Sequence, residues 1–139
     1  MRAGIGVRHL EMNSNVPMFV TNRACVPGGV FSGPLVVSMR PVATEKIDLA
    51  IAVTEPFQHA HGSPVHIGDP SALGIANLSQ PDFGDAVDVR DGEQPVFWAC
   101  GVTPQLAIQA ARPDLAITHE PGQMFITDLT EANDVRTIS

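Results

Sequence analysis

Charged side chains are scarce in this sequence. Only 17% of its 139 residues are charged, whereas about a quarter is typical of globular domains. So few charges solvate a free surface poorly. We therefore expect part of the surface to be covered, either by another subunit of a homo-oligomer or by chain that this sequence lacks.

Basic residues, cysteines and long apolar runs are also few. Eight scattered Lys and Arg against 15 Asp and Glu give a net charge of −7, which argues against nucleic acid as a partner. Cys25 and Cys100 are too few for a disulfide scaffold, and they predict reduced thiols in a cytoplasmic protein. The N-terminal stretch MRAGIGVRHLEMN has no apolar signal core, and no run approaches a membrane span in length. We expect no membrane partner.

Twelve prolines and twelve glycines divide the chain into short elements. Residue patterns predict a mixed α/β fold, a mixed sheet with short helices. A loop is predicted at 22–34. An Asp-Pro-Ser cap predicts a helical turn at 69–72. The other predicted elements are strands at 16–20, 35–39, 64–67, 115–118 and 124–127, a hairpin at 86–99 that turns at Asp91-Gly92, and helices at 45–54 and 103–112.

Two junctions between a strand and a helix are candidate ligand sites. The stretches HIGDPSA (66–72) and WACGVTPQ (98–105) each present backbone N–H groups at a helix start, where anions and ligands bind. Cys100 lies just ahead of the second helix, where a helix dipole can lower the pKa of a thiol. The alternative is a small buried residue at the end of a core strand.

Three histidines fall within residues 59–70, HAHGSPVHIGDP. His59 and His61 would share one side of a strand and could bind a metal there. Pro and Gly on both sides favour a loop instead, so we expect no tight metal site. Acid–base or substrate-contacting roles for His61 and His66 are favoured, and structural histidines are the alternative.

Two turn-like stretches add polar groups. PDFGD (81–85) places Asp82 and Asp85 on a probable turn, where they either share acid–base work or form ordinary turn hydrogen bonds. The stretch His119-Glu120-Pro121-Gly122 is either a functional loop after a strand or an ordinary turn.

Six long stretches, in order along nearly the whole chain, resemble the D-glutamate cyclase family, whose bacterial members are mostly named hydro-lyases. They are NVPMF (15–19), TNRACVPGGVFSGPLVVSMRP (21–41), HGSPVHIGDP (61–70), PDFGD (81–85), PVFWACGVTPQ (95–105) and ITHEPGQMFITDL (117–129). The resemblance implies interconversion of D-glutamate and 5-oxo-D-proline with loss or gain of water, on a small carboxylate or amino-acid substrate. We expect no cofactor.

Family members are roughly twice as long, and the resemblance covers their C-terminal half. It implies that residues 1–129 are the C-terminal portion of a larger two-part α/β fold, followed by a polar tail at 130–139. The alternatives are a non-catalytic fragment that binds a small acid, and a lyase or hydrolase that acts on another small carboxylate.

The sequence departs from the family pattern at two places. Pro56-Phe57-Gln58 stands where the family usually has Arg-Phe-Pro, so an arginine that could bind a carboxylate is missing. Gln123 stands where the family often has His. Since His61 and His66 match the family block and His59 lies outside it, we interpret the His59–His61 pair as accidental.

Cyclising glutamate requires a base for the amine, donors to an oxyanion, an acid for the leaving oxygen and an anchor for the α-carboxylate. Backbone N–H groups of 101–103 could serve as oxyanion donors, and Arg40 or a helix N-terminus as the anchor. The predicted catalytic residues are His61, His66, Asp82, Cys100 and His119, with Cys100 as an optional covalent carrier. The predicted substrate-binding residues are Asn15, Asn22, Arg40, Asp69, Gly101 and Thr103. We predict that His61, His66, Asp82 and the loop 100–103 converge on one cleft.

Overall fold

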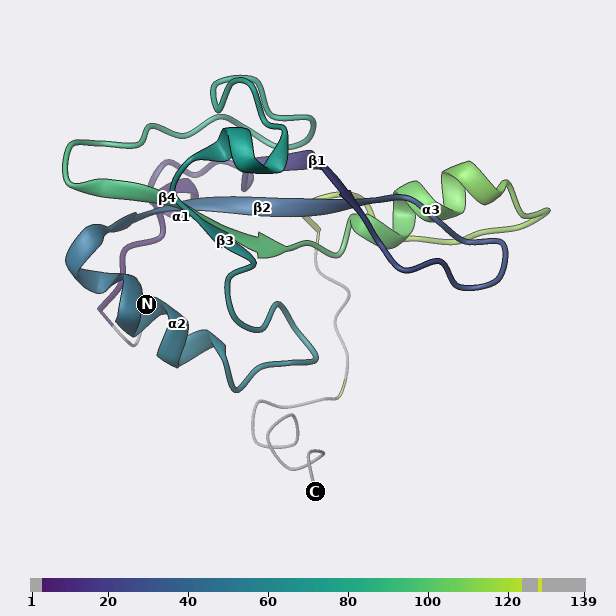
Figure 1. The fold of residues 1–139 in the computed structure, drawn as a ribbon, viewed down its shortest axis with the longest axis horizontal. Coiled ribbons are helices and arrows are strands. Elements are labelled where there is room, and N and C mark those ends of the chain that lie inside the picture. Colours follow the sequence, from purple (N-terminus) through teal and green to yellow (C-terminus); the bar gives the residue numbers. More distant parts are fainter. Residues whose placement is uncertain (1–3, 124–127, 129–139) are drawn as a thin grey trace.

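A four-stranded antiparallel sheet forms the centre of the computed structural model, which describes residues 4–123 and residue 128 (Figure 1). Its strand order is β1-β2-β4-β3. The strands are β1 (Met18–Ala24), β2 (Pro34–Ala43), β3 (His66–Ile67) and β4 (Glu93–Ala99). The helices are α1 (Arg8–Glu11), η1 (Thr44–Lys46), α2 (Ile47–Thr54), η2 (Pro70–Leu73) and α3 (Thr103–Ala111). The predicted mixed α/β class with short helices is confirmed.

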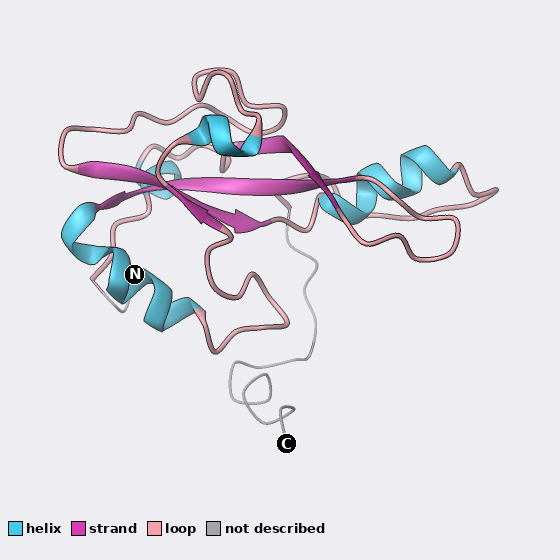
Figure 2. Cartoon of the chain, viewed as in Figure 1, coloured by secondary structure: helices cyan, strands magenta, loops and turns pink. Residues whose placement is uncertain are grey.

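Strand β2 is the longest and lies between β1 and β4 (Figure 2). Successive side chains of a strand point to opposite faces, so Val37 and Met39 lie on one face while Ser38 and Arg40 lie on the other. We call the first the closed face and the second the open face. The register pairs Ser38 with Trp98 and Arg40 with Val96, which places Trp98 on the open face.

The closed face carries the largest apolar cluster. Phe19, Met39 and Phe97 pack there against Leu73 of η2 and Val87. Val37 and Ile75 complete the buried set. These side chains are buried, and none of them lines the cavity described below.

Helix α2 covers part of the open face. Its Ala50 is buried against Val42, Val96 and Trp98, and Ile5 of the N-terminal segment packs beside them. A separate cluster around Met18, Val36 and Val102 seats α3 at the other end of the same face. The open face is therefore covered at both ends by different elements.

Both predicted helices are present, η1 and α2 over the first and α3 over the second, and Asp69 caps η2 as predicted. The hairpin at 86–99 is wrong in its first arm, because residues 86–90 form no strand. Both edges of β4 are already paired, with β2 and with β3, so no edge is left for them.

Other predictions at the strand level have mixed outcomes. Strand β1 runs on to Ala24, into the stretch predicted as loop. The strand predicted at 115–118 is absent, and its apolar side chains are exposed. The strand predicted at 124–127 and the tail at 130–139 lie outside the described residues. Within the described part of the chain, no helix combines the length and apolarity needed to cross a membrane.

Candidate active site

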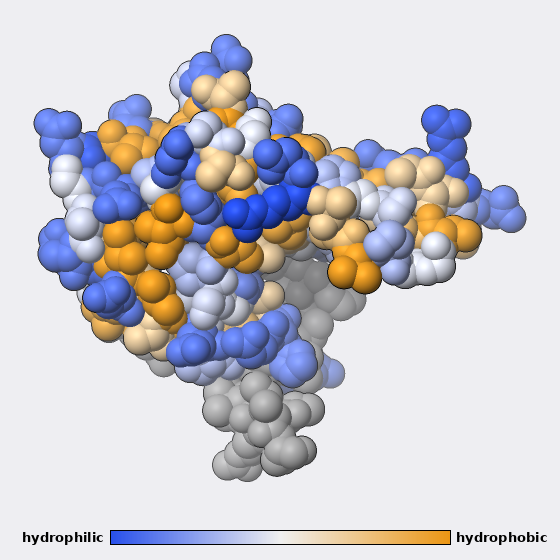
Figure 3. Space-filling model, in the orientation of Figure 1, coloured by the Kyte–Doolittle hydropathy of each residue, from blue (hydrophilic) through white to orange (hydrophobic). Residues whose placement is uncertain are grey.

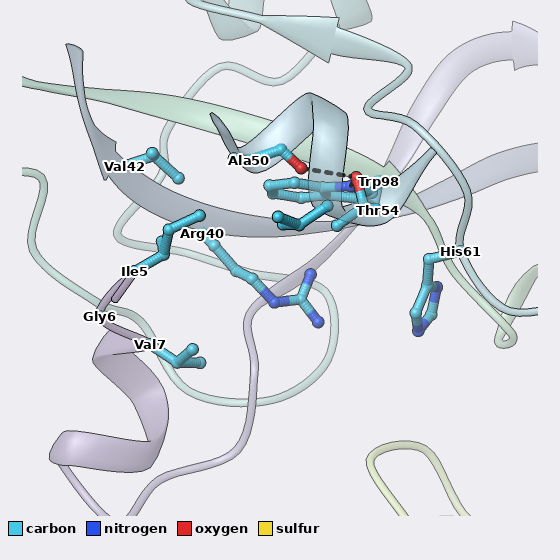
Figure 4. A pocket seen from close by; sticks show the side chains of 10 residues that line it. Ile5, Gly6, Val7, Arg40, Val42, Ala50, Thr54, His61 and Trp98 are labelled. Carbon is cyan, nitrogen blue, oxygen red and sulfur yellow. Dashed lines mark hydrogen bonds between the residues drawn. The ribbon is translucent and has the colours of Figure 1, made fainter. Parts of the chain in front are cut away.

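A cavity of about 250 Å³ opens on the open face, between the sheet, α2 and the N-terminal segment (Figure 4). Its described lining consists of Ile5, Gly6, Val7, Arg40, Val42, Ala50, Val53, Thr54, His61 and Trp98. Most of these side chains are apolar. Two can carry a positive charge, Arg40 and His61, and none of the described lining residues is acidic.

Arg40 projects into this cavity from the centre of the sheet (Figure 4). Its Nη1 donates to Ser38 Oγ at 3.0 Å, and its guanidinium carbon lies 5.3 Å from the centre of the Trp98 ring. No carboxylate among the described residues forms a salt bridge with it, whereas the buried Arg8 pairs with Glu93 and Glu11. Burial lowers the pKa of Arg40, and nearby Cys100 acts in the opposite direction. Arg40 is thus a partly desolvated cation with donors to spare.

Trp98 forms the wall on which Arg40 rests. The indole is buried, and its Nε1 donates to Thr54 Oγ1 at 3.3 Å. The Thr54 hydroxyl in turn donates to the carbonyl of Ala50 at 2.8 Å, within α2. This chain of hydrogen bonds ties the plane of the ring to α2, so the helix sets the position of the arginine.

His61 lies across the cavity from the Arg40 guanidinium (Figure 4). It lies in a turn that ends at Gly62, which adopts φ +60° and donates from its N–H to Phe57 O. Its Nδ1 lies 2.6 Å from the carbonyl oxygen of Ala99. A carbonyl only accepts, so Nδ1 carries the hydrogen and Nε2 of the neutral ring is left as a proton acceptor.

Cys100 lies at the end of β4, close to Arg40. Of the two interpretations of Cys100, the structure supports the packed residue at the end of a strand, because partial burial raises the pKa of the thiol. The N–H groups of Val102 and Gly101, together with Arg40, act in the opposite direction but more weakly. A partly buried thiol with a raised pKa stays protonated at neutral pH and is a poor nucleophile.

Two residues predicted to bind substrate lie next to Cys100 and are held by the fold. The Thr103 hydroxyl accepts from Val36 N at 2.9 Å and donates to Val36 O at 3.2 Å. It therefore prolongs the ladder of β2 beyond Ala99. Gly101 faces His119, whose Nε2 would lie 3.9 Å from a Cβ at that glycine.

His119 is held in place through backbone contacts. Its Nδ1 lies 2.9 Å from Glu120 O, and its own carbonyl accepts from Gln105 Nε2 at 2.8 Å. Asn15 holds the same turn by donating to Pro121 O at 3.4 Å. This group lies beside α3 and does not line the cavity.

His66 and Asp69 form a unit of their own on the closed face. His66 Nε2 lies 2.8 Å from the carbonyl of Asp69, and its ring centre lies 5.8 Å from that of Phe97. The Asp69 carboxylate accepts from Ser71 N at 2.9 Å and from Ser71 Oγ at 2.6 Å. The Ser71 hydroxyl, followed by its N–H, lowers the pKa of Asp69. These contacts start η2.

Asn22, on strand β1, and Asp82, in the turn beside that strand, lie further away. Asp82 Oδ2 accepts from Val20 N at 2.7 Å. Asn22 is exposed and packs beside Gly74, at the end of η2. Neither lines the cavity.

The predicted single cleft does not form among the described residues. Arg40 and His61 share the cavity, while Cys100, Gly101 and His119 lie beside it and His66 lies across the sheet. The sequence argument missed Ser38, Thr54 and Trp98. Two signals in the sequence could have indicated Ser38 and Trp98. One is a serine two residues before an arginine on a strand, and the other is that Trp98 is the only tryptophan of the chain. No group of three or more His, Cys, Asp or Glu among the described residues is arranged to hold a metal ion.

Comparisons of the sequence with a family and with individual proteins agree with each other. Residues 1–128 match the family described as D-glutamate cyclase. A protein of Arthrobacter sp. (strain FB24) is 58% identical over 130 residues, 94% of this chain and 49% of that protein. One of Stutzerimonas stutzeri (strain A1501) is 59% identical over 128 residues, 92% of this chain and 48% of that protein. One of Clostridium beijerinckii is 52% identical over 128 residues, 92% of this chain and 49% of that protein.

All three proteins carry the name "Putative hydro-lyase". The chain spans about half the length of the curated relatives it matches.

Proposed function

The chain belongs to the D-glutamate cyclase family, and on that premise we propose that its cavity binds a small carboxylate through Arg40 and serves a hydro-lyase reaction. The observation that carries the proposal is an arginine without a described acidic partner, held against Trp98 in the wall of the cavity. A planar guanidinium binds a carboxylate through two parallel hydrogen bonds. One such bond pair would fix the substrate at one end.

The leading candidate reaction is the interconversion of D-glutamate and 5-oxo-D-proline. The amine nitrogen forms a bond to the carbon of the γ-carboxyl group, and a C–O bond of that same carbon breaks. The nitrogen gives up two protons, and the departing oxygen takes both as it leaves as water. Arg40 would hold the α-carboxylate, which does not react.

His61 is the residue that we assign to proton transfer. Its Nδ1–H is held by Ala99 O, which leaves Nε2 to take a proton from the amine and to deliver it to the departing oxygen. The geometry supports His61 over His66, whose ring is engaged with Asp69 O and Phe97 on the closed face. The protonated thiol of Cys100 gives a covalent route little support.

The cavity suits the cyclic form better than the open one. D-Glutamate carries an ammonium group, and no acidic residue stands among the described lining residues to bind it. 5-Oxo-D-proline has one carboxylate and a compact ring without a positive charge. We therefore expect this chain to bind 5-oxo-D-proline more tightly than D-glutamate.

The same observation favours a second candidate, a hydro-lyase that acts on another small carboxylate without an amino group. An apolar wall beside a single arginine would accept such a molecule equally well. Ligand preference separates the two candidates, because only the first predicts selectivity for the five-membered cyclic amide.

Fluorescence titration tests the proposal, since Trp98 is the only tryptophan and contacts Arg40. The chain is titrated with 5-oxo-D-proline, D-glutamate, L-glutamate and a panel of small hydroxy acids. We expect saturable binding of 5-oxo-D-proline, with Kd about 10- to 100-fold higher in Arg40→Gln, because a hydrogen bond to a charged group is lost.

The matched control is Arg23→Gln, which removes an exposed arginine from β1. It should leave Kd unchanged. Equal Kd values in the wild type and Arg40→Gln would refute the carboxylate site. Tighter binding of a hydroxy acid than of 5-oxo-D-proline would favour the second candidate.

A further inference from the structure

The loop that joins β1 to β2 projects beyond the end of the sheet together with α3 and the segment that follows α3 (Figure 1). The loop and the helix are in contact, since a Cβ at Gly33 would lie 3.6 Å from Ala107 N. Cys25 N donates to Gly33 O at 2.9 Å and closes the base of the loop. We call the loop 25–33 and the segment 112–118 the apolar arm.

The arm exposes apolar side chains to an unusual degree. Val26 is 95% exposed, Val30 76%, Leu115 79% and Ile117 88%. Phe31 adds a partly exposed ring. Residues 25–33 contain no charged residue at all, and neither do residues 115–118. Apolar surface lies on this projection of the molecule in Figure 3.

Such a surface differs from the scattered apolar residues found on most proteins. Leu10, Met12 and Leu49 are also exposed, but only by about half and on other elements. The only charged residues of the arm are Arg112 and Asp114. A concentration of exposed aliphatic and aromatic side chains with so few charges is typical of a surface that another polypeptide covers.

The length comparison indicates which polypeptide this is. Relatives 52–59% identical to this chain carry about as much sequence again outside the part that it matches. We expect a sequence as long as the matched half to pack against it, and the closed face is already covered by η2 and its neighbours. The arm carries the four most exposed large hydrophobic side chains among the described residues.

We infer that the apolar arm is the docking surface for the half of the family's chain that this sequence does not match. The contact is made by the aliphatic side chains of the loop 25–33 and the segment 112–118. It lies on elements distinct from the wall formed by Arg40 and Trp98, so it serves assembly of the two halves and does not depend on the proposed reaction.

The test uses a chimera of the Arthrobacter relative. In it, this chain takes the place of the half of that protein that it matches, and the unmatched half is kept. The arm variant combines Val26→Ser, Leu115→Ser and Ile117→Ser, and is made both in this chimera and in the 139-residue chain. In the chain alone these positions are exposed, so the melting temperature should shift by less than about 2 °C. In the chimera it should fall by about 5 °C or more, because the same side chains are buried there.

Leu49→Ser is the matched control, an exposed leucine on α2, and should shift the two proteins equally. Hydrogen exchange provides a second measurement, in which the amides of 25–33 should exchange at least tenfold more slowly in the chimera. Equal shifts or equal exchange in the two proteins would overturn the inference, and so would a chimera that does not fold. A dimer of the 139-residue chain that the arm variant dissociates would assign the surface to a second copy instead, and would also overturn it.

Discussion

His61 and His66 are five residues apart, and each has one ring nitrogen within hydrogen-bond distance of a backbone carbonyl, at 2.6 and 2.8 Å. Their surroundings nevertheless differ completely. His61 is exposed and faces the cavity that contains Arg40, whereas His66 rests on Phe97 and holds the start of η2. The residue type and its hydrogen bond are therefore uninformative by themselves. The face of the sheet decides whether a histidine is available for chemistry.

The same division runs through neighbouring residues of β2. Met39 is fully buried in the closed face, and Arg40 projects from the open one. The closed face should therefore respond to substitution with a loss of stability, and the open face with a loss of ligand binding. Four predictions test this division, taken here from the largest expected effect to the smallest.

Met39→Ala should lower the free energy of unfolding by about 2–5 kcal/mol, because it leaves a cavity in a close-packed cluster. Urea denaturation measures the loss. Kd for 5-oxo-D-proline, measured under conditions where the variant is folded, should not change. Arg40→Gln is the matched comparison one residue away, and it should cost clearly less stability. If Arg40→Gln proves as destabilising as Met39→Ala, the two faces are not functionally distinct.

His66→Ala should lower the free energy of unfolding by about 1–2 kcal/mol, because the hydrogen bond to Asp69 O and the contact with Phe97 are both lost. His61→Ala removes an exposed side chain and should cost less than about 1 kcal/mol. Ligand titration of the same two proteins should show the reverse order. Weaker binding in His66→Ala than in His61→Ala would contradict our assignment of proton transfer to His61.

Thr54→Val should lower the free energy of unfolding by about 1 kcal/mol, because the buried indole N–H of Trp98 loses its acceptor. The emission of Trp98 should change with it, and Kd should rise as the ring ceases to position Arg40. Thr54→Ser keeps the hydroxyl and should restore both properties. Unchanged emission in Thr54→Val would show that the hydrogen bond does not hold the ring.

The smallest effect concerns pH and His9, on α1. Burial, and after it the charge of Arg40, lowers the pKa of His9 below the ordinary value of 6.5. The folded state then binds fewer protons than the unfolded state, so the stability is fully present above pH 6.5 and declines as the pH falls through the folded pKa. Urea denaturation at about pH 7.5 and about pH 5.5 should show a decline that His9→Gln reduces. An equal decline of the free energy of unfolding in the variant would show that His9 does not cause the decline.

Local patterns in the sequence were enough for the helices and for part of the site. The periodic stretches before Pro56 and after Thr103 predicted α2 and α3, and Asp-Pro-Ser predicted the cap of η2. Arg40 was named as a carboxylate anchor, and the structure places it in the wall of a cavity. Each of these inferences depends on residues close together in the sequence.

The misses depend on distant residues. The first arm of the predicted hairpin at 86–99 failed because β4 pairs on both sides with strands far away in the sequence. His61 and His66 were assigned to one cleft because strand ends and helix N-termini gather at one edge of an α/β sheet. The pairing of His66 with Phe97, a distant residue, places His66 on the closed face instead. The sequence left Cys100 open between an activated and a packed thiol, because the burial that raises its pKa comes from other elements, which a single segment cannot reveal.

The turn at 82–85 covers one of the two outer strands of the sheet, β1. An outer strand with free N–H groups is a template for joining further chains into fibrils. Here Phe83 O accepts a hydrogen bond from the N–H of Met18, and the Asp82 carboxylate accepts one from the N–H of Val20. Gly84 lets the turn lie flat against the strand, since any Cβ would collide with Val16 O. Asp82→Ala would leave the N–H of Val20 without this acceptor, so we expect the variant to aggregate more readily than the wild type.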